Sequence, residues 1–245
     1  MTWRPRAIHQ FHGGSGVGDA VTGGLFYIRD LLREMGFRSE IYCADVAPEL
    51  AGDIHGAASL PDDPDSLLLV HYSWRIAYLD WLRRLSCRQA LVYHNITPEE
   101  FFDNAQFVDY ARESRAQLRQ FGETMPAALT QSDYSARELR RLGLAQVDVQ
   151  PLLFDPARWR AAPVDEDYLR RLHADPAFKI LFVGRIVANK CQDDLVRVME
   201  PLRRLVSRPV RLIMPGGLGA GQPYQDHVLR LVQDMGLQAE VTLPG

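Results

Sequence analysis

Short apolar runs alternate with longer segments of helical periodicity along most of the chain. The runs are four or five residues long and rich in aliphatic and aromatic side chains, which is typical of buried strands. In the first part of the chain, strands are predicted at 7–11, 39–43, 67–70, 90–93, 127–130 and 147–150. Because parallel neighbours need a crossover connection and helices supply it, this alternation predicts βαβ units and a parallel sheet.

Helical periodicity fills the intervals between these strands. The predicted helices span 25–35, 76–85, 107–121 and 132–142. Gly36 and Gly143 directly follow two of them, and glycine is the preferred residue where a helix ends. Ser132 stands where a side-chain cap for the last of these helices is needed.

The alternation is interrupted at 151–176, where four prolines break a polar stretch with one short helix around 167–173. Segments of this kind join compact domains. A second series follows, with strands at 179–183, 210–214 and 240–243 and helices at 192–206 and 224–235. We therefore predict an α/β protein with an N-terminal Rossmann-like domain at 1–151, a linker at 152–176 and a partial C-terminal domain at 177–245. Both domains are expected to be doubly wound, the second incomplete because it has only three predicted strands.

The composition of the chain does not alter the predicted fold, but it argues against several classes of protein. The 245 residues are 47% hydrophobic and carry a formal net charge of −3, so no overall field attracts nucleic acid. The longest aliphatic runs fall far short of the roughly 20 residues of a membrane span, and no secretory signal is visible. Three cysteines without Cys-x-x-Cys spacing argue against a zinc site or a disulfide framework. We expect a cytoplasmic protein that binds no nucleic acid.

Glycines cluster between the first predicted strand and its helix, at Gly13, Gly14 and Gly16. Ligands of open α/β sheets bind at this carboxyl edge, where glycines let backbone N–H groups approach and a helix N-terminus favours an anion. A dinucleotide fingerprint would need glycine at Asp19 or Val21, and a Walker A loop would need lysine at Asp19. The cluster therefore predicts a ligand loop of another kind, and a flexible turn without chemical use is the alternative.

Three histidines stand at or next to the carboxyl ends of predicted strands: His12, His71 and His94. A single histidine so placed is more often a satisfied core residue, but three on one edge favour a polar site. An imidazole can donate a hydrogen bond to a sugar hydroxyl or transfer a proton near neutral pH. None of the three has the spacing of a metal site, so no protein-held metal is predicted.

The second series begins with another glycine turn. Gly184 follows its first strand, and Arg185 and Lys190 then place two cations at the loop that leads to the next helix. An arginine fork and a lysine point charge suit a diphosphate, whereas solvated surface charge is the alternative. Gly216 and Gly217 end the next strand in a second loop that lets a ligand approach the backbone.

Three segments carry a resemblance to a known family. They are FVGRI at 182–186 with Asn189 and Lys190, YHNITP at 93–98, and SDYS at 132–135 leading into Glu138. Through them the chain resembles the family 4 glycosyltransferases of the GT-B class over essentially its whole length, and the glycine turn after the first strand agrees.

The resemblance implies two Rossmann-like domains that face each other across a cleft. The first would bind a glycan or lipid-linked acceptor, and the second a nucleotide-sugar donor. Transfer would proceed with retention, without a metal ion or cofactor, in polysaccharide biosynthesis. Arg185 and Lys190 would stabilise the departing diphosphate, and His94 would lie near the donor sugar as a third catalytic residue.

Other interpretations stay open at this point. Members of the family have a longer second domain, with a pair of glutamates that hold the nucleotide ribose. The segment 177–245 lacks that pair and the rest of the domain. A non-catalytic or split remnant that needs a partner chain to complete this domain is therefore an alternative, followed by a GT-B sugar-nucleotide epimerase and an NAD oxidoreductase. Basic stretches at 81–85 and 137–141 are compatible with peripheral contact at the inner face of the membrane, or with a solvated face.

Overall fold

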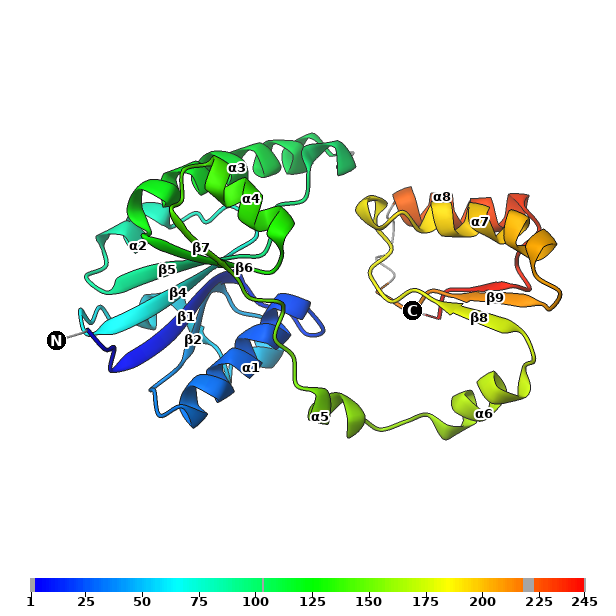
Figure 1. Ribbon diagram of the computed structural model, residues 1–245, viewed down its shortest axis with the longest axis horizontal. Helices are drawn as coiled ribbons and strands as arrows, with labels where there is room; N and C mark the ends of the chain where they lie inside the picture. The colour runs from blue at the N-terminus through cyan, green and yellow to red at the C-terminus, as the bar shows by residue number, and fades with distance from the viewer. Residues whose placement is uncertain (1–2, 103, 218–222, 245) are drawn as a thin grey trace. The chain divides into compact units, whose positions relative to one another are not determined.

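The computed structural model describes residues 3–102, 104–217 and 223–244. The chain divides into two compact units, Met1–Ala161 and Ala162–Gly245 (Figure 1). Each unit contains one sheet in which every described strand pair is parallel. The predicted α/β class with parallel sheets is thereby confirmed.

The sheet of unit 1 has seven strands in the order β3-β2-β1-β4-β5-β6-β7. These strands are β1 (Ala7–Gly14), β2 (Ile41–Asp45), β3 (His55–Gly56), β4 (Ser66–Tyr72), β5 (Arg88–Tyr93), β6 (Ala127–Thr130) and β7 (Gln146–Val149). The order reverses between β1 and β4. Such a switch point opens a crevice at the carboxyl ends of the two strands, where ligands of this architecture bind.

Helices cover both faces of this sheet (Figure 1). They are α1 (Ala20–Glu34), α2 (Leu79–Arg84), α3 (Ala105–Thr124) and α4 (Asp133–Arg141). The short helix α5 (Pro156–Arg160) and the 3₁₀ turns η1 (Pro48–Leu50), η2 (Ala57–Ser59) and η3 (Glu99–Phe101) also belong to unit 1. Leu25 of α1 packs with Ile41 on one face, whereas Phe121 of α3 and Leu139 of α4 belong to the larger core on the other. Burial on both faces explains the uninterrupted apolar runs of the strands.

Helix ends follow the local signals in the sequence. The Ser132 side chain accepts a hydrogen bond from the backbone N–H of Ser135 and caps α4. Gly36 and Gly143 follow α1 and α4 with φ of +88° and +94°. An L side chain is strained in this left-handed region, so these predicted glycine stops are confirmed.

Several strand ends differ from the predicted ones. β1 continues to Gly14 and β4 to Tyr72, because pairing persists between Gly14 and Asp45 and between Tyr72 and Tyr93. The glycine cluster therefore begins inside a strand rather than in the turn. Two short elements were not predicted, β3 and α5. A strand ends where its backbone hydrogen bonds to the neighbouring strands stop. The pattern of polar and apolar residues alone does not reveal that position.

The helix predicted at 76–85 is shorter in the structure and begins only at Leu79. The amide of Gln117, on α3, accepts a hydrogen bond from the Ile76 N–H at 2.8 Å and donates one to the Ile76 carbonyl at 3.0 Å. The Ser114 hydroxyl accepts from the N–H of Arg75 at 2.8 Å. These bonds hold the segment in a loop, although its apolar spacing is helical.

Unit 2 is a smaller α/β unit. It contains α6 (Glu166–Ala174), β8 (Phe178–Leu181), η4 (Ala188–Lys190), α7 (Gln192–Leu205), β9 (Val210–Ile213), α8 (Pro223–Asp234) and β10 (Val241–Thr242). The strand order is β10-β9-β8. Figure 1 shows α7 and α8 on the same face of this sheet, where Val196 and Val228 pack with Leu212 in a separate core.

Candidate functional site

Three imidazoles meet at the switch point of unit 1. His12 of β1 lies beside His71 of β4 in the parallel register, and the backbone N–H of His94, just after β5, donates to the Tyr72 carbonyl at 2.9 Å. The ring centroid of His94 lies 5.1 Å from that of His71 and 6.4 Å from that of His12. The structure thus brings together the three histidines that the sequence placed at this edge.

A hydrogen-bonded chain joins two of these histidines to Gln131. His71 Nδ1 lies 2.8 Å from His94 Nε2, and His94 Nδ1 lies 2.7 Å from Gln131 Nε2. With the Gln131 amide donating, His94 carries its proton on Nε2 and donates to His71. The proton of His71 is then on Nε2, which is buried without a partner among the described residues. Both nitrogens of His94 are engaged, so Gln131 must turn away before His94 can bind a ligand through Nδ1.

His12 is held by a separate pair of contacts. Its Nδ1 lies 2.5 Å from the carbonyl oxygen of Gly14, which can only accept, so Nδ1 carries the proton. Its Nε2 lies 3.4 Å from the Ser73 hydroxyl, which can donate to it. These two contacts fix one tautomer of a neutral ring.

Burial lowers the pKa of all three imidazoles. The pKa of His94 falls to about 4, because the ring is buried and, secondarily, because it lies near His12. The pKa of His71 is well below its usual value, first through burial and then through repulsion by His94 and His12. Desolvation disfavours the charged form, so the cluster is neutral at pH 7 and acts through hydrogen bonds rather than positive charge.

A network with α3 and α4 positions the segment that carries His94. The buried Tyr93 hydroxyl donates to Glu138 at 2.7 Å and accepts from the Ile96 N–H at 3.2 Å. Arg115 donates to the other Glu138 oxygen at 2.5 Å and to the Ile96 carbonyl at 3.1 Å. Residues on both sides of His94 are therefore anchored, which preorganises the ring.

The glycines after β1 have different surroundings. Gly13 has open space where a side chain would stand, and Gly14 makes only ordinary contact with Asp45. The N–H of Gly16 donates to the Thr22 hydroxyl at 3.1 Å, and the Asp19 carboxylate caps α1 through the Thr22 N–H at 2.8 Å. The helix N-terminus thus already holds a carboxylate, and the Gly16 amide would have to exchange its partner to bind a ligand.

The cations of unit 2 stand on an anchored loop. The N–H of Gly184 donates to the Pro215 carbonyl at 3.0 Å, and the buried Gln192 donates to the Arg185 carbonyl at 2.8 Å. Arg185 and Lys190 are both exposed, and in the described part of the chain neither side chain has a hydrogen-bond or ion-pair partner. Their backbone is held while their charges stay free. Arg185 and Lys190 belong to unit 2, whereas the three histidines belong to unit 1.

Gly216 is required by the packing of two loops. A Cβ on this residue would overlap the carbonyl oxygen of Gly184 and lie 2.5 Å from the Gly184 carbonyl carbon. The adjacent Gly217 has nothing within 4 Å of such an atom. The loop after β9 therefore supports the Arg185 loop through a backbone contact that only glycine allows, a role that the sequence did not reveal.

Replacing Gly216 with alanine is expected to destabilise unit 2 by about 1–3 kcal/mol, because the backbone of Gly184 must move to admit the methyl group. Gly217→Ala is the matched control and should stay within about 0.5 kcal/mol of the parent. Hydrogen exchange of peptides from β8 and β9 measures the difference. Equal protection in both variants would contradict the proposed clash.

Cavities lined wholly by described residues of unit 1 lie at opposite edges of the sheet. One, of 200 Å³, adjoins Gly13 and Ala44 at the carboxyl edge and is lined by aromatic residues after β4. The sequence analysis missed these residues, as it missed Gln131. Gln131 directly follows β6, the same signal that identified His94, whereas Trp74 lies two residues beyond the end of β4.

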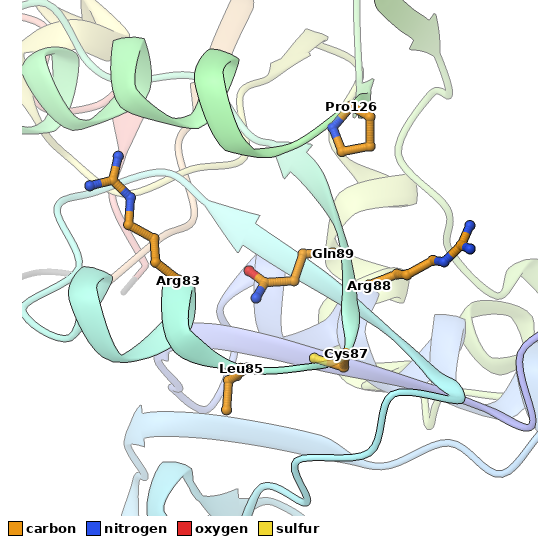
Figure 2. Close-up of a pocket in the computed structure, with 6 residues that line it drawn as sticks. All are labelled: Arg83, Leu85, Cys87, Arg88, Gln89 and Pro126. Atoms are coloured by element: carbon orange, nitrogen blue, oxygen red, sulfur yellow. The ribbon is translucent and has the colours of Figure 1, made fainter.

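The other cavity, of 290 Å³, lies near the beginning of β5, at the edge away from the histidines. Figure 2 shows that the guanidinium groups of Arg83 and Arg88 point away from each other across it. Gln89 donates to the Leu82 carbonyl at 2.6 Å, and Arg88 stacks on Trp3. Its charged groups do not converge on a common point, so this cavity has no features of an anion site.

Two further findings concern the described residues as a whole. Within 3–102, 104–217 and 223–244, no three histidine, cysteine or carboxylate side chains are grouped in a way that could hold a metal ion. None of the helices in this part of the chain is both long and apolar enough to cross a bilayer.

Comparison with known proteins yields similarity in structure only. No protein-family model matches the chain, and no curated protein matches its sequence. HepE of Anabaena, solved with UDP and glucose, aligns over 98% of this chain and 69% of its own, with 17% identity and a TM-score of 0.63. A glycosyltransferase from Rickettsia africae aligns over 97% and 68%, with 12% identity and a TM-score of 0.62.

WaaG, a glycosyltransferase involved in lipopolysaccharide biosynthesis, aligns over 96% of this chain and 69% of its own, with 12% identity and a TM-score of 0.55. The chain thus spans about two thirds of the length of these three structures. At such identities the similarity establishes the fold alone: the chain has the α/β architecture of part of a GT-B glycosyltransferase.

Proposed function

We propose that this chain is a retaining glycosyltransferase that moves a sugar from a nucleotide-sugar donor to a glycan or lipid-linked acceptor. The observation that carries the proposal is that Arg185 and Lys190, on an anchored loop, have no side-chain partner among the described residues. HepE, which has a similar fold, is solved with UDP and glucose, and this supports a uridine nucleotide as the first donor to test.

The two units differ in charge, and this difference supports a division of labour. At the carboxyl edge of unit 1 the imidazoles are neutral and Asp19 already caps α1. Such an edge suits a neutral polyhydroxyl acceptor. In unit 2, Arg185 and Lys190 lie on one loop without a partner among the described residues, and such a pair suits a diphosphate. We therefore assign the acceptor to unit 1 and the nucleotide sugar to unit 2.

In the proposed reaction, the bond between the anomeric carbon and the diphosphate oxygen breaks and its electron pair stays with the diphosphate. The acceptor hydroxyl oxygen bonds to the same face of the anomeric carbon, and its proton passes to the departing diphosphate. Fixed cations stabilise the charge that develops on this leaving group. Arg185 and Lys190 supply them, with the backbone at Gly184, Gly216 and Gly217 close to the diphosphate.

His94 has a different role in this proposal. Because its pKa is lowered to about 4, it meets the donor sugar as a neutral ring. Once Gln131 turns away, its Nδ1 can accept a hydrogen bond from a sugar hydroxyl. The backbone at Gly13, Gly14 and Gly16 would form the adjacent wall of the site. His94, Arg185 and Lys190 are thus the proposed catalytic residues.

The test is transfer by the full chain. Purified protein is incubated with UDP-glucose and, separately, other nucleotide sugars, together with a panel of methyl glycosides and a polyprenyl phosphate sugar. Released nucleoside diphosphate and new glycosides are measured by mass spectrometry, and the anomeric configuration by NMR. Product with the donor's configuration supports the proposal. Absence of both UDP binding and transfer would exclude it.

A chain that acts only together with a second polypeptide is the other candidate. Among the described strands, β8 stands at one edge of its sheet, and Leu181 on it is 65% exposed. Apolar side chains on an open sheet edge are normally covered. This alternative predicts that UDP binds without transfer, and that transfer appears when a second subunit is added.

A further inference from the structure

The 200 Å³ cavity at the carboxyl edge of unit 1 has no role in the site described so far. It is lined by Gly13, Ala44, Trp74, Arg75, Ile76, Ala77, Tyr78 and Tyr110. Pockets for drug-sized ligands start at about 300 Å³, so this one has room for a single ring. All its lining residues belong to unit 1, and its floor is the end of β1 and β2.

The loop after β4 that forms one wall is preorganised by α3. Ser114, fully buried, accepts from the N–H of Arg75, and Gln117 bonds both the N–H and the carbonyl of Ile76. The buried Tyr72 hydroxyl donates to the Ser114 carbonyl at 2.7 Å, which fixes α3 against β4. A wall held by so many bonds needs little ordering when a ligand binds, and this favours affinity.

Three of the eight lining residues are aromatic, namely Trp74, Tyr78 and Tyr110. Trp74 contacts Tyr110, with ring centroids 6.3 Å apart, and Phe102 at 5.7 Å. Tyr78, which is 53% exposed, is also among the lining residues. The C–H groups on one face of a pyranose pack on aromatic rings of this kind, while its hydroxyls need polar partners at the rim.

The charge of Arg75, which lines the cavity, is compensated by an ion pair with Glu113. Arg75 is the one charged residue among those that line the cavity, and its guanidinium lies 3.2 Å from the Glu113 carboxylate and 4.2 Å from the Tyr110 ring centroid. Arg75 lines the cavity and can donate hydrogen bonds to sugar hydroxyls, whereas Glu113 is not a lining residue and compensates the Arg75 charge. Because the Arg75 charge is already compensated, a phosphate gains little here.

The cavity adjoins the histidine cluster along two strands. Gly13 lines it and follows His12, while Trp74 lines it and follows Ser73. His12 and Ser73 are themselves in contact, at 3.4 Å between Nε2 and the hydroxyl oxygen. A ring bound in the cavity therefore lies next to the proposed catalytic edge.

We infer that this cavity binds one neutral pyranose ring of the acceptor, stacked on Trp74 and Tyr78 and held through its hydroxyls by Arg75. The inference rests on the proposed function and narrows it, because it assigns a sugar rather than a lipid phosphate to the acceptor side. The three residues that would recognise the sugar, Trp74, Arg75 and Tyr78, all lie in one five-residue stretch of the loop after β4.

The test uses the full chain and the methyl glycosides of glucose, galactose, mannose and N-acetylglucosamine as probes, with binding followed by saturation-transfer NMR. At least one glycoside should bind to the parent. Tyr78→Ala, at an exposed position, and Trp74→Ala should each weaken it by about tenfold. Tyr134→Ala and Trp159→Ala, which remove residues that are 65% and 75% exposed, are the matched controls and should bind as the parent does.

The outcomes separate this inference from the proposed function. Glycosides that do not bind, or that bind equally to Tyr78→Ala and the parent, overturn the inference. The same holds if glycerol phosphate displaces the glycoside at equal concentration. UDP binding is measured in parallel on the same samples: its absence would contradict the proposed donor site, while a glycoside signal that depends on Tyr78 would still support the sugar pocket.

Discussion

Replacing Arg185 or Lys190 with alanine is expected to slow sugar transfer by about 10²–10³-fold, the usual effect of removing one group that stabilises charge in the transition state. Each side chain is exposed and has no partner among the described residues, so its loss removes charge from the leaving diphosphate and little else. Initial rates of UDP release in the presence of acceptor measure the effect.

Arg230→Ala, at an exposed position on α8, is the matched control for the loss of one positive charge and should keep the parent rate. Arg185→Lys should recover part of the rate, because lysine keeps the charge but lacks the planar fork that binds two phosphate oxygens. Unfolding free energies of both alanine variants should lie within about 0.5 kcal/mol of the parent. If Arg185→Ala and Lys190→Ala both kept the parent rate of transfer, the two side chains would not stabilise the leaving diphosphate.

Unit 1 is expected to lose stability steeply as the pH falls below about 6.5. Burial lowers the pKa of His9, His12, His71 and His94 in the folded state, whereas the unfolded chain titrates near the ordinary histidine value. Below that value the unfolded state binds protons that the folded state rejects, so acid favours unfolding. With a folded pKa of about 4, His94 alone accounts for about 2 kcal/mol lost by pH 5.

Urea titrations at pH 7.5, 6.5, 5.5 and 5 test this expectation. All four tryptophans of the sequence belong to unit 1, so their fluorescence reports on this unit. His94→Gln removes a titrating ring but keeps an amide that can hydrogen bond, and its stability should depend less on pH. His173→Gln, at an exposed position on α6 of unit 2, removes a histidine outside the unit that the tryptophans report on and should leave the unit 1 transition unchanged. An equal slope in His94→Gln and the parent would show that His94 does not titrate in this window.

The two results together would report on different parts of the proposed site. Transfer rates in the Arg185 and Lys190 variants follow the cations of unit 2, and the acid transition follows the imidazoles of unit 1. The neutral cluster is also relevant to catalysis, because a positively charged His94 could not accept a hydrogen bond from the sugar. Transfer should therefore persist down to the pH at which unit 1 unfolds.

Local information in the amino-acid sequence was enough for the fold class. Apolar runs of strand length alternate with helical periodicity, and this pattern depends on neighbours a few residues apart, so it predicted two parallel α/β sheets. The stops at Gly36 and Gly143 and the cap at Ser132 are equally local, since they depend on one residue's backbone or side chain. The edge that holds the histidines followed from topology, because carboxyl ends of parallel strands share one edge.

Contacts between distant residues decided the rest. The loop before α2 exists because Gln117, 41 positions away, bonds to the backbone of Ile76. Gly216 is needed because its loop packs against Gly184, and the protonation of His94 depends on His71 and Gln131. Each of these partners is brought close only by the folded chain, and the strength of a buried hydrogen bond depends on that enclosure. Periodicity along the sequence therefore locates the site, whereas packing determines its charge, its tautomers and the pocket beside it.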